Sequence, residues 1–217
     1  MKRTALVLML SAVFAAAAPV ATVVAAPAAP AAAKPVGGAG RLVLDNSTRI
    51  LNTLETRRGE FQKNRAALKQ FVSGEFNQMF DRNYAARLVL GAHGRGASDA
   101  DVAKFADALS ENLMQRYGSS LLDFNTKLTV RLKSETTVAN GRATKVSTQM
   151  LRQGGEPIPV DYLMHQVNGQ WKVFDVLVEG VSFVQTFRNQ FDGPLSRGSI
   201  AQVAADLRAG KLKADAR

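Results

Sequence analysis

Two carboxylic acids lie in an apolar stretch near the end of the chain, where acid–base chemistry could be built. Asp175 and Glu179 fall within residues 171–182, where Lys172 is the only other charged residue. Two carboxyls in such surroundings can act as a general acid and a general base. The commoner arrangement is that one of them caps a helix or forms a local ion pair, for which Arg188 is a candidate partner. The sequence favours this second role.

Other catalytic residue types are scarce. Cysteine is absent, which excludes disulfides, zinc–thiolate sites, iron–sulfur clusters and thiol catalysis. The two histidines are His93, in a polar glycine-rich loop, and His165, which alternates with apolar residues on an expected strand. We expect both to face solvent. Neither a phosphate-binding glycine loop nor a G-x-S-x-G motif occurs. The sequence therefore predicts no metal centre, no cofactor and no enzyme active site.

The apolar side chains are the unusual part of the composition. The chain has 11 phenylalanines and six methionines. Flat and flexible side chains of this kind either pack an ordinary core or adapt to an irregular guest molecule. Core-facing and pocket-facing positions look alike in a sequence, so the pattern alone leaves both interpretations open. The positions concerned are Phe76, Met79, Phe80, Met150, Met164, Phe183 and Phe187.

Length and charge set the broad class. The 217 residues are enough for one domain or a tight pair, and 46% of them are hydrophobic, enough to bury a core. Lysine and arginine outnumber the acids by 28 to 18, which gives a formal charge of +10. Such a charge permits binding to nucleic acid, to an anionic membrane surface or to an acidic protein.

The N-terminus narrows these choices. Lys2 and Arg3 precede an uncharged run over residues 5–18, and small residues follow up to Ala25. This pattern predicts a secretory signal peptide over residues 1–25, cleaved after Ala25. The alternative is a membrane anchor formed by the same apolar residues. Export from the cytoplasm argues against a nucleic-acid partner, and cleavage lowers the formal charge from +10 to +8.

The remaining chain divides by composition and period. Residues 26–41 are rich in alanine, proline and glycine, which predicts a flexible tether. We expect the folded domain over residues 42–210 and a polar tail at 211–217. Apolar residues recur at helical spacing in the first and last parts of this domain, whereas they alternate in the part between.

The alternating part predicts a four-stranded antiparallel meander. Turn signals at Asn140-Gly141 and Asn168-Gly169 separate its segments. Helices before and after such a sheet predict an α+β domain, a four-stranded antiparallel sheet covered by helices. The expected strands lie at residues 128–132, 146–150, 160–164 and 171–178.

Three segments carry a resemblance to a known family. They are residues 84–91 (YAARLVLG), 171–182 (WKVFDVLVEGVS) and 185–191 (QTFRNQF). These segments resemble the MlaC family of periplasmic phospholipid-transfer proteins, also called toluene-tolerance proteins, and the resemblance extends over about residues 42–208. It implies a cone-shaped fold like that of nuclear transport factor two. It also implies a deep apolar cavity that holds acyl chains while the lipid headgroup stays outside.

The same resemblance implies the partners. A monomeric carrier of this family would shuttle phospholipid between an outer-membrane lipoprotein–porin complex and an inner-membrane ABC-transporter complex of the Mla system, which maintains outer-membrane lipid asymmetry. Such a carrier needs no cofactor. Two other hypotheses remain: an enzyme on the same scaffold that uses Asp175 or Glu179, and an interaction domain with a filled core.

If the interior is a cavity, inward strand positions and one face of several helices would contact the acyl chains. One slip in register would move a whole strand to the other face of the sheet. The predicted lipid-contacting residues are Phe76, Leu88, Leu113, Val130, Val146, Met150, Tyr162, Met164, Val176, Phe183 and Phe187.

Overall fold

A computed structural model describes residues 37–122 and 127–215. The predicted signal peptide, most of the predicted tether and the last two residues lie outside the described residues. Within the described segments, no helix is long and apolar enough to cross a membrane.

Helices form the first and last parts of the domain, and strands form the part between, as predicted. Proline and glycine lie mostly between these elements or at their ends, with Gly74 inside α3 and Gly193 and Pro194 inside α6 as exceptions. The helical elements are α1 (Gly38–Thr56), α2 (Arg58–Lys63), α3 (Arg65–Met79), α4 (Arg82–Leu90), η1 (Gly91–Gly94), α5 (Asp99–Tyr117), η2 (Ser119–Leu122), α6 (Phe183–Arg197) and α7 (Ile200–Arg208).

The strands form one antiparallel sheet in the order β1-β2-β3-β4-β5, which confirms the predicted meander for the first four strands. Asn140 and Gly141, and likewise Asn168 and Gly169, have positive φ angles, as the predicted tight turns require. The strands are β1 (Thr129–Val138), β2 (Ala143–Leu151), β3 (Ile158–Val167), β4 (Gln170–Val178) and β5 (Val181–Ser182).

The predicted number of four strands is too low by one. Glu179 and Gly180 have φ angles of 52° and 83° and reverse the chain after β4. The two residues of β5 then pair with the end of β4 before α6 begins. Two residues are too few to produce an alternating pattern, so the sequence gives no strand signal there.

Helix α1 begins at Gly38, four residues before the predicted start of the domain, so the last residues assigned to the tether belong to the fold. The backbone N–H of Gly40 donates to the carboxylate of Glu135 on β1 at 2.8 Å. A Cβ on Gly37 would lie 2.2 Å from a carboxylate oxygen of Glu135. Glycine therefore marks a close approach between the start of α1 and the sheet rather than a linker.

The predicted polar tail packs on the helices as far as residue 215. Ala214 is fully buried, and its backbone N–H donates to Oδ1 of Asn112 at 2.9 Å. The side-chain amide of Gln190 donates to the carbonyl of Lys213 at 2.9 Å. The described residues beyond α7 are therefore part of the domain.

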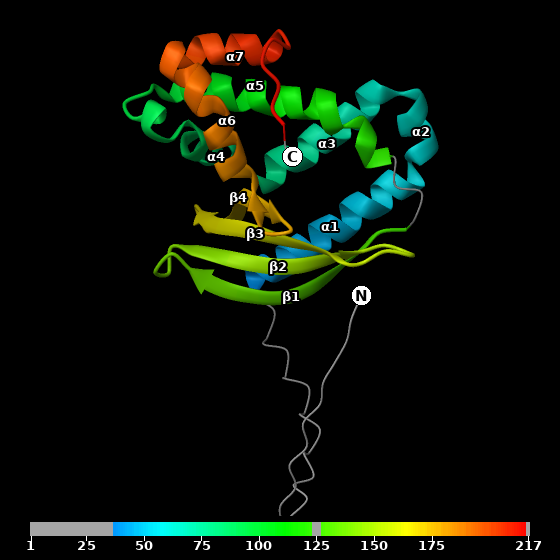
Figure 1. Ribbon diagram of the computed structural model, residues 1–217. Helices are drawn as coiled ribbons and strands as arrows, with labels where there is room; N and C mark the ends of the chain where they lie inside the picture. Colours follow the sequence, from blue (N-terminus) through cyan, green and yellow to red (C-terminus); the bar gives the residue numbers. More distant parts are fainter. Residues whose placement is uncertain (1–36, 123–126, 216–217) are drawn as a thin grey trace, which may run out of the picture. The chain divides into compact units, whose positions relative to one another are not determined.

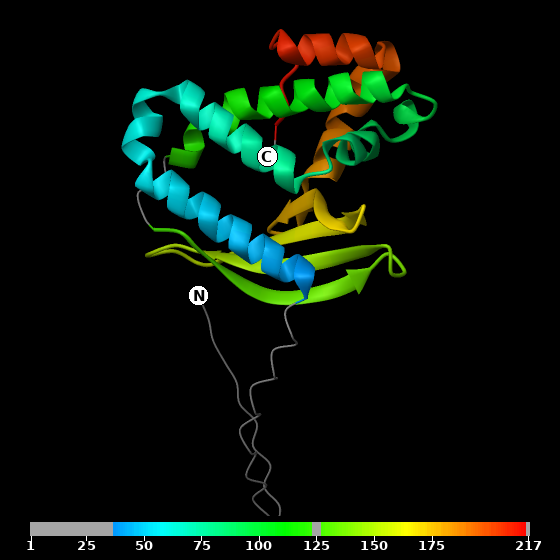
Figure 2. The ribbon, with the colours of Figure 1, turned by 180° about the vertical axis from the view of Figure 1, so that it is seen from behind.

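The helices meet the sheet in two ways. α1 lies across one face of the sheet (Figure 2), where it packs on β1, β2 and β4. We call this covered side the inner face. α4, α5, α6 and α7 pack on one another and reach the sheet where α4 and α6 contact β4 (Figure 1). α3 packs on α2 and on β4.

The buried apolar side chains of the described residues form three clusters. The sheet cluster, between α1 and the sheet, consists of Ala39, Val43, Val146, Met164 and Val173. The corner cluster, between α1, α2, α3 and η2, consists of Leu54, Phe61, Leu68 and Leu122. The helical cluster, among α4 to α7 and the segment after them, consists of Ala86, Val89, Leu90, Val102, Phe105, Ala106, Ala108, Leu109, Phe187, Phe191, Leu195, Val203, Ala204, Leu207 and Ala214.

Candidate functional site

The two candidate catalytic acids have different environments. Asp175 is buried, and its carboxylate accepts hydrogen bonds from the Ser182 hydroxyl at 2.6 Å and from the Val184 backbone N–H at 3.0 Å. It therefore anchors the start of α6 to β4. Glu179 is exposed in the turn between β4 and β5. Neither hydrogen bond described for Asp175 joins it to Glu179.

Arg188, the candidate ion-pair partner, has another role. Its Nε donates to the carbonyl of Leu88 at 2.7 Å, near the C-terminal end of α4. The guanidinium therefore satisfies a helix-end carbonyl, which is a favourable place for a cation. The prediction that Arg188 pairs with one of the two acids is not supported.

The histidines are both paired with aspartates. His165 lies on the outer face of the sheet, as predicted, but it is half-buried, and its Nε2 lies 3.0 Å from Oδ2 of Asp81. His93 is also half-buried, with Nε2 3.0 Å from Oδ1 of Asp192. The prediction that both histidines face solvent is therefore wrong in the extent of their exposure, since each is half-buried against an aspartate. Among the residues that the structure describes, no cluster of His, Cys, Asp and Glu could hold a metal ion.

The predicted strand residues share the inner face of the sheet. Val146, Tyr162 and Val176 are direct neighbours across β2, β3 and β4. Val130 pairs with Met150 toward one end of the same face. Ala39 and Val43 of α1 pack against the centre of this face. The set that the register brings together is Val130, Val146, Met150, Tyr162, Met164 and Val176.

The predicted helix residues are divided between two places. Phe76 stacks on Phe80 with ring centroids 4.1 Å apart, and Phe80 packs against the sheet cluster. Leu113, Phe183 and Phe187 instead pack in or against the helical cluster. Leu88, on α4, is half-buried. The structure therefore brings Phe76 toward the strand residues and places three of the other predicted residues among the helices.

Incomplete burial distinguishes the inner face. Val146 and Met164 are fully buried, but Val130, Met150 and Tyr162 keep partial exposure although α1 covers part of this face. Val176 is also half-buried. Apolar surface inside a fold that stays partly accessible can accept apolar atoms of a guest molecule.

Tyr162 carries the one phenol on this face. The residue as a whole keeps partial exposure, but its phenol oxygen is buried, and this burial raises the pKa of Tyr162 above its usual value. A hydrogen bond with Ser47 of α1 partly offsets the effect. The phenol is therefore neutral at physiological pH and links β3 to α1. Tyrosine combines an apolar ring with a polar end in this way.

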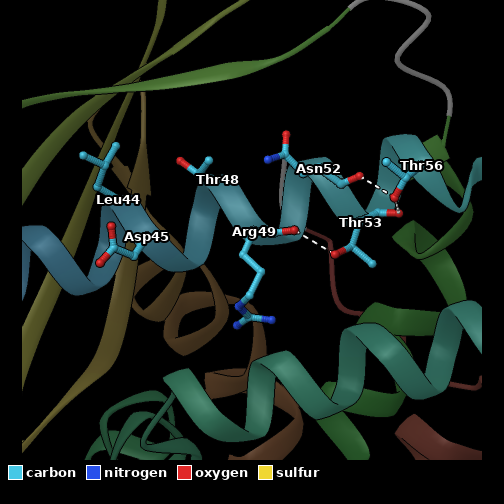
Figure 3. Close-up of a pocket in the computed structure, with 7 residues that line it drawn as sticks. All are labelled: Leu44, Asp45, Thr48, Arg49, Asn52, Thr53 and Thr56. Carbon is cyan, nitrogen blue, oxygen red and sulfur yellow. Dashed lines mark hydrogen bonds between the residues drawn. The ribbon is translucent and has the colours of Figure 1, made fainter.

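Sequence analysis missed a polar groove along α1. The groove has a volume of about 580 Å³ (Figure 3). Its lining residues follow one another three or four positions apart, the spacing of one helix face. That spacing is visible in the sequence, but a polar helix face is usually ordinary solvated surface, so the pattern does not predict a binding site. The lining residues are Leu44, Asp45, Thr48, Arg49, Asn52, Thr53 and Thr56.

Arg49 is the only cation among these seven described lining residues. Its guanidinium donates to both carboxylate oxygens of Glu75 on α3 and to Oδ1 of Asn46 at 3.0 Å. The hydrogen bond with Glu75 raises the pKa of Arg49, whereas burial lowers it. The Arg49 side chain is 46% exposed and that of Glu75 is 12% exposed. Arg49 therefore lines the groove while its guanidinium is hydrogen-bonded to Glu75.

The sequence model of the MlaC protein family matches residues 44–209, from α1 to just beyond α7. The chain belongs to the MlaC family. Among the relatives of this MlaC-family chain, toluene tolerance protein ttg2D of Pseudomonas putida is 25% identical over 158 residues, 72% of each chain. The intermembrane phospholipid transport system binding protein MlaC of Haemophilus influenzae is 20% identical over 162 residues, 73% of this chain and 75% of that protein.

A solved structure shares the fold. It is a phospholipid-binding protein from Ralstonia solanacearum in complex with a phospholipid, with a TM-score of 0.70 and 21% sequence identity. The match covers 80% of this chain and 98% of that chain. The likeness confirms the α+β fold class that the sequence predicted.

Proposed function

We propose that this MlaC-family chain is a periplasmic phospholipid carrier whose acyl-chain site lies on the inner face of the sheet. The observation that carries the proposal is the set of apolar side chains on that face. Six of them share it by register, and four of the six remain half-buried. These four are Val130, Met150, Tyr162 and Val176.

The physical task fits such a surface. A two-chain phospholipid has roughly 30 methylenes, and each costs about 0.8 kcal/mol when it is moved from an apolar environment into water. Unassisted transit between membranes is therefore prohibitive. A carrier needs apolar surface about as favourable as the bilayer, and it needs neither a cofactor nor a covalent step.

The relatives support the same substrate class. The Haemophilus influenzae relative is named as the binding protein of an intermembrane phospholipid transport system. The structural neighbour from Ralstonia solanacearum was solved with a phospholipid bound. We infer that this chain exchanges phospholipid between an outer-membrane lipoprotein–porin complex and an inner-membrane ABC-transporter complex, and thereby maintains outer-membrane lipid asymmetry.

The enzyme alternative lacks comparable support. Asp175 uses its carboxylate to hold the start of α6, and Glu179 is exposed in a turn. A general acid and base must reach the same substrate atoms. No described contact joins these two groups at one pocket, whereas the inner-face residues adjoin one another.

Native mass spectrometry of the gently purified mature protein tests the proposal. We expect the chain to carry an additional mass equal to that of a phospholipid, and to take up phospholipid from vesicles after the bound lipid has been removed. A chain that carries no lipid and takes up none contradicts the carrier function.

Mass measurement of the same sample also tests processing, because cleavage after Ala25 leaves Ala26 as the first residue. Full-length chain retained in the membrane pellet at high salt contradicts export as a soluble protein.

A further inference from the structure

Helix α1 separates a polar groove from the apolar interior. One side of α1 contributes Ala39 and Val43 to the sheet cluster and Leu54 to the corner cluster. The other side lines the groove with hydroxyl, amide and charged side chains. A phospholipid has the same division, because its acyl chains require apolar surface and its headgroup requires polar contacts or water. A bound lipid could therefore place its acyl chains on the interior side of α1 and its headgroup on the groove side, with α1 as the border between them.

The ion pair between Arg49 and Glu75 lies on this border. In Figure 3 the Arg49 side chain extends from α1 toward α3, where Glu75 accepts both of its hydrogen bonds. The next residue after Arg49 is Ile50, which packs against the corner cluster. The next residue after Glu75 is Phe76, whose ring stacks on Phe80 beside the sheet cluster. On both helices an apolar side chain that packs toward the interior is therefore next in sequence to a member of the ion pair.

The pair joins two helices that pack mainly on other elements. α1 packs on β1, β2, β4 and α2, whereas α3 packs on α2 and β4. α1 and α3 also share the corner cluster, through Leu54 and Leu68, and the ion pair is a further contact between the two helices. The Arg49 side chain is 46% exposed, so an anion in the groove can reach its guanidinium while the two helices stay packed.

The chemistry of the guanidinium specifies what can replace Glu75. Arginine presents a planar fork of N–H donors that binds a carboxylate or a phosphate group through two parallel hydrogen bonds. Arg49 is charged at all physiological pH values. Thr48 and Asn52, its neighbours along the groove, are neutral and do not repel an anion. Asp45 of the same groove is an acid, so a phosphate on Arg49 is favoured on the side of Thr48 and Asn52.

We propose that Arg49 binds the phosphodiester of the phospholipid headgroup at the border between groove and interior, and that Glu75 holds the guanidinium when no lipid is bound. This inference rests on the proposed carrier function and adds a headgroup ligand to it. The same guanidinium could also bind free inorganic phosphate, and the experiment below distinguishes the lipid headgroup from the free ion. Acyl chains supply most of the binding free energy, and Arg49 distinguishes lipids that carry a phosphate from those that do not.

The test compares two lipids with identical acyl chains, phosphatidylglycerol and diacylglycerol, offered in neutral carrier vesicles to the delipidated full-length mature protein. Arg49→Gln should lower phosphatidylglycerol binding about tenfold, the size of one charge-assisted bidentate contact, and leave diacylglycerol binding unchanged within about twofold. Glu75→Gln should raise phosphatidylglycerol binding, because the competitor for Arg49 is weakened. Arg57→Gln is the matched control, since Arg57 follows α1 directly and is paired with exposed Glu60 outside the groove. It should bind both lipids as the wild type does.

Each outcome separates the headgroup inference from the carrier function. Equal loss of both lipids in Arg49→Gln, or equal loss of phosphatidylglycerol in Arg57→Gln, overturns the role of Arg49 as a phosphate ligand. Wild-type protein that binds neither lipid overturns the carrier function itself. Inorganic phosphate is added in a further arm. If it binds through Arg49 as tightly as phosphatidylglycerol does, the site is one for free phosphate, and the headgroup assignment is wrong. Thermal melting identifies any variant that fails to fold. If Arg49→Gln fails to fold, Arg49→Lys replaces it, because lysine keeps the positive charge but lacks the planar fork of donors. Arg49→Lys should bind phosphatidylglycerol less well than the wild type does.

Discussion

The helical cluster and the inner face of the sheet are both apolar, but they are packed differently. Among the described residues, fifteen buried side chains form the helical cluster, and the rings of Phe187 and Phe105 both contact Phe191. The sheet cluster has five, and neighbours such as Tyr162 and Val176 on the same face are only half-buried. A closely packed core stabilises the fold, whereas incompletely covered apolar surface is available to a ligand. We therefore expect stability to depend mainly on the helices and ligand binding mainly on the sheet.

The largest effect should come from removing an aromatic ring from the helical cluster. Phe191 is 1% exposed and contacts Phe105 edge to face with centroids 5.7 Å apart. Phe191→Ala should lower the free energy of unfolding by about 3–5 kcal/mol, because it removes buried area and leaves a cavity. Urea unfolding measures the loss. A loss below about 1 kcal/mol would mean that the helical cluster is not the main stabilising core.

Enlarging a side chain should affect the two regions in opposite ways. Val176→Trp, on the half-buried inner face, should reduce bound phospholipid about tenfold with little change in melting temperature, because the indole occupies space that the acyl chains need. Val89→Trp is the matched variant in the helical cluster, where Val89 is 2% exposed. It should be destabilised by about 1–3 kcal/mol through overpacking. Calorimetry and lipid extraction measure the two effects. If Val176→Trp melts early and Val89→Trp does not, the distinction between the regions is reversed.

The buried carboxylate of Asp175 joins the two regions, since it connects β4 to the start of α6. Asp175→Ala should cost about 1–3 kcal/mol, because the Ser182 hydroxyl and the Val184 N–H lose their acceptor. Glu179→Gln is the control in the exposed turn and should change stability by less than about 0.5 kcal/mol. Chemical denaturation measures both. A reaction found with the wild type and lost in Glu179→Gln, with stability and lipid binding intact, would favour the enzyme hypothesis instead.

The smallest effect should come from Tyr162→Phe, which removes the phenol that links the sheet to α1. Loss of its hydrogen bond with Ser47 should cost about 0.5–1.5 kcal/mol at neutral pH. The pKa of Tyr162 is raised in the folded state, so its contribution is present below the unfolded value of about 10 and is lost as the pH rises through the folded value. The stability of the wild type should therefore fall faster above about pH 10 than that of Tyr162→Phe. Parallel curves from pH 9 to 11 would mean that the phenol is not buried in solution.

Much of the fold could be predicted because local signals in this chain are strong. Alternation and two Asn-Gly pairs predict the meander, and Ser98 and Ser199 cap α5 and α7 as their positions before helical runs suggest. The short strand β5 was missed because pairing of two residues leaves no periodic trace. The start of α1 was missed because a glycine-rich segment looks the same in the sequence whether it forms a flexible linker or, as here, a close contact between a helix and a strand.

The candidate site could be predicted only in part. Alternation within a strand is sufficient to group inner-face residues such as Val146 and Met150. The pairing of Val130 with Met150 could not be predicted from the turn, because the register shifts between Leu132 and Ser134. Helical periodicity could not show that Leu113 and Phe183 pack in the helical layer, because an amphipathic helix does not specify which neighbour its apolar face contacts. Arg49 gave no signal at all, because its partner Glu75 lies 26 residues away on another helix.

By itself the sequence determined the order of the helical and strand regions, the alternation of residues within the four long strands and, through three short segments, the family. These properties depend on interactions between residues close in the chain, which periodicity and turn chemistry encode. Only the tertiary structure decided that Asp175 holds α6, that Arg188 caps α4 and that Arg49 lies on the border of the interior. These roles depend on distances between elements far apart in the chain, and a side chain's type does not specify them.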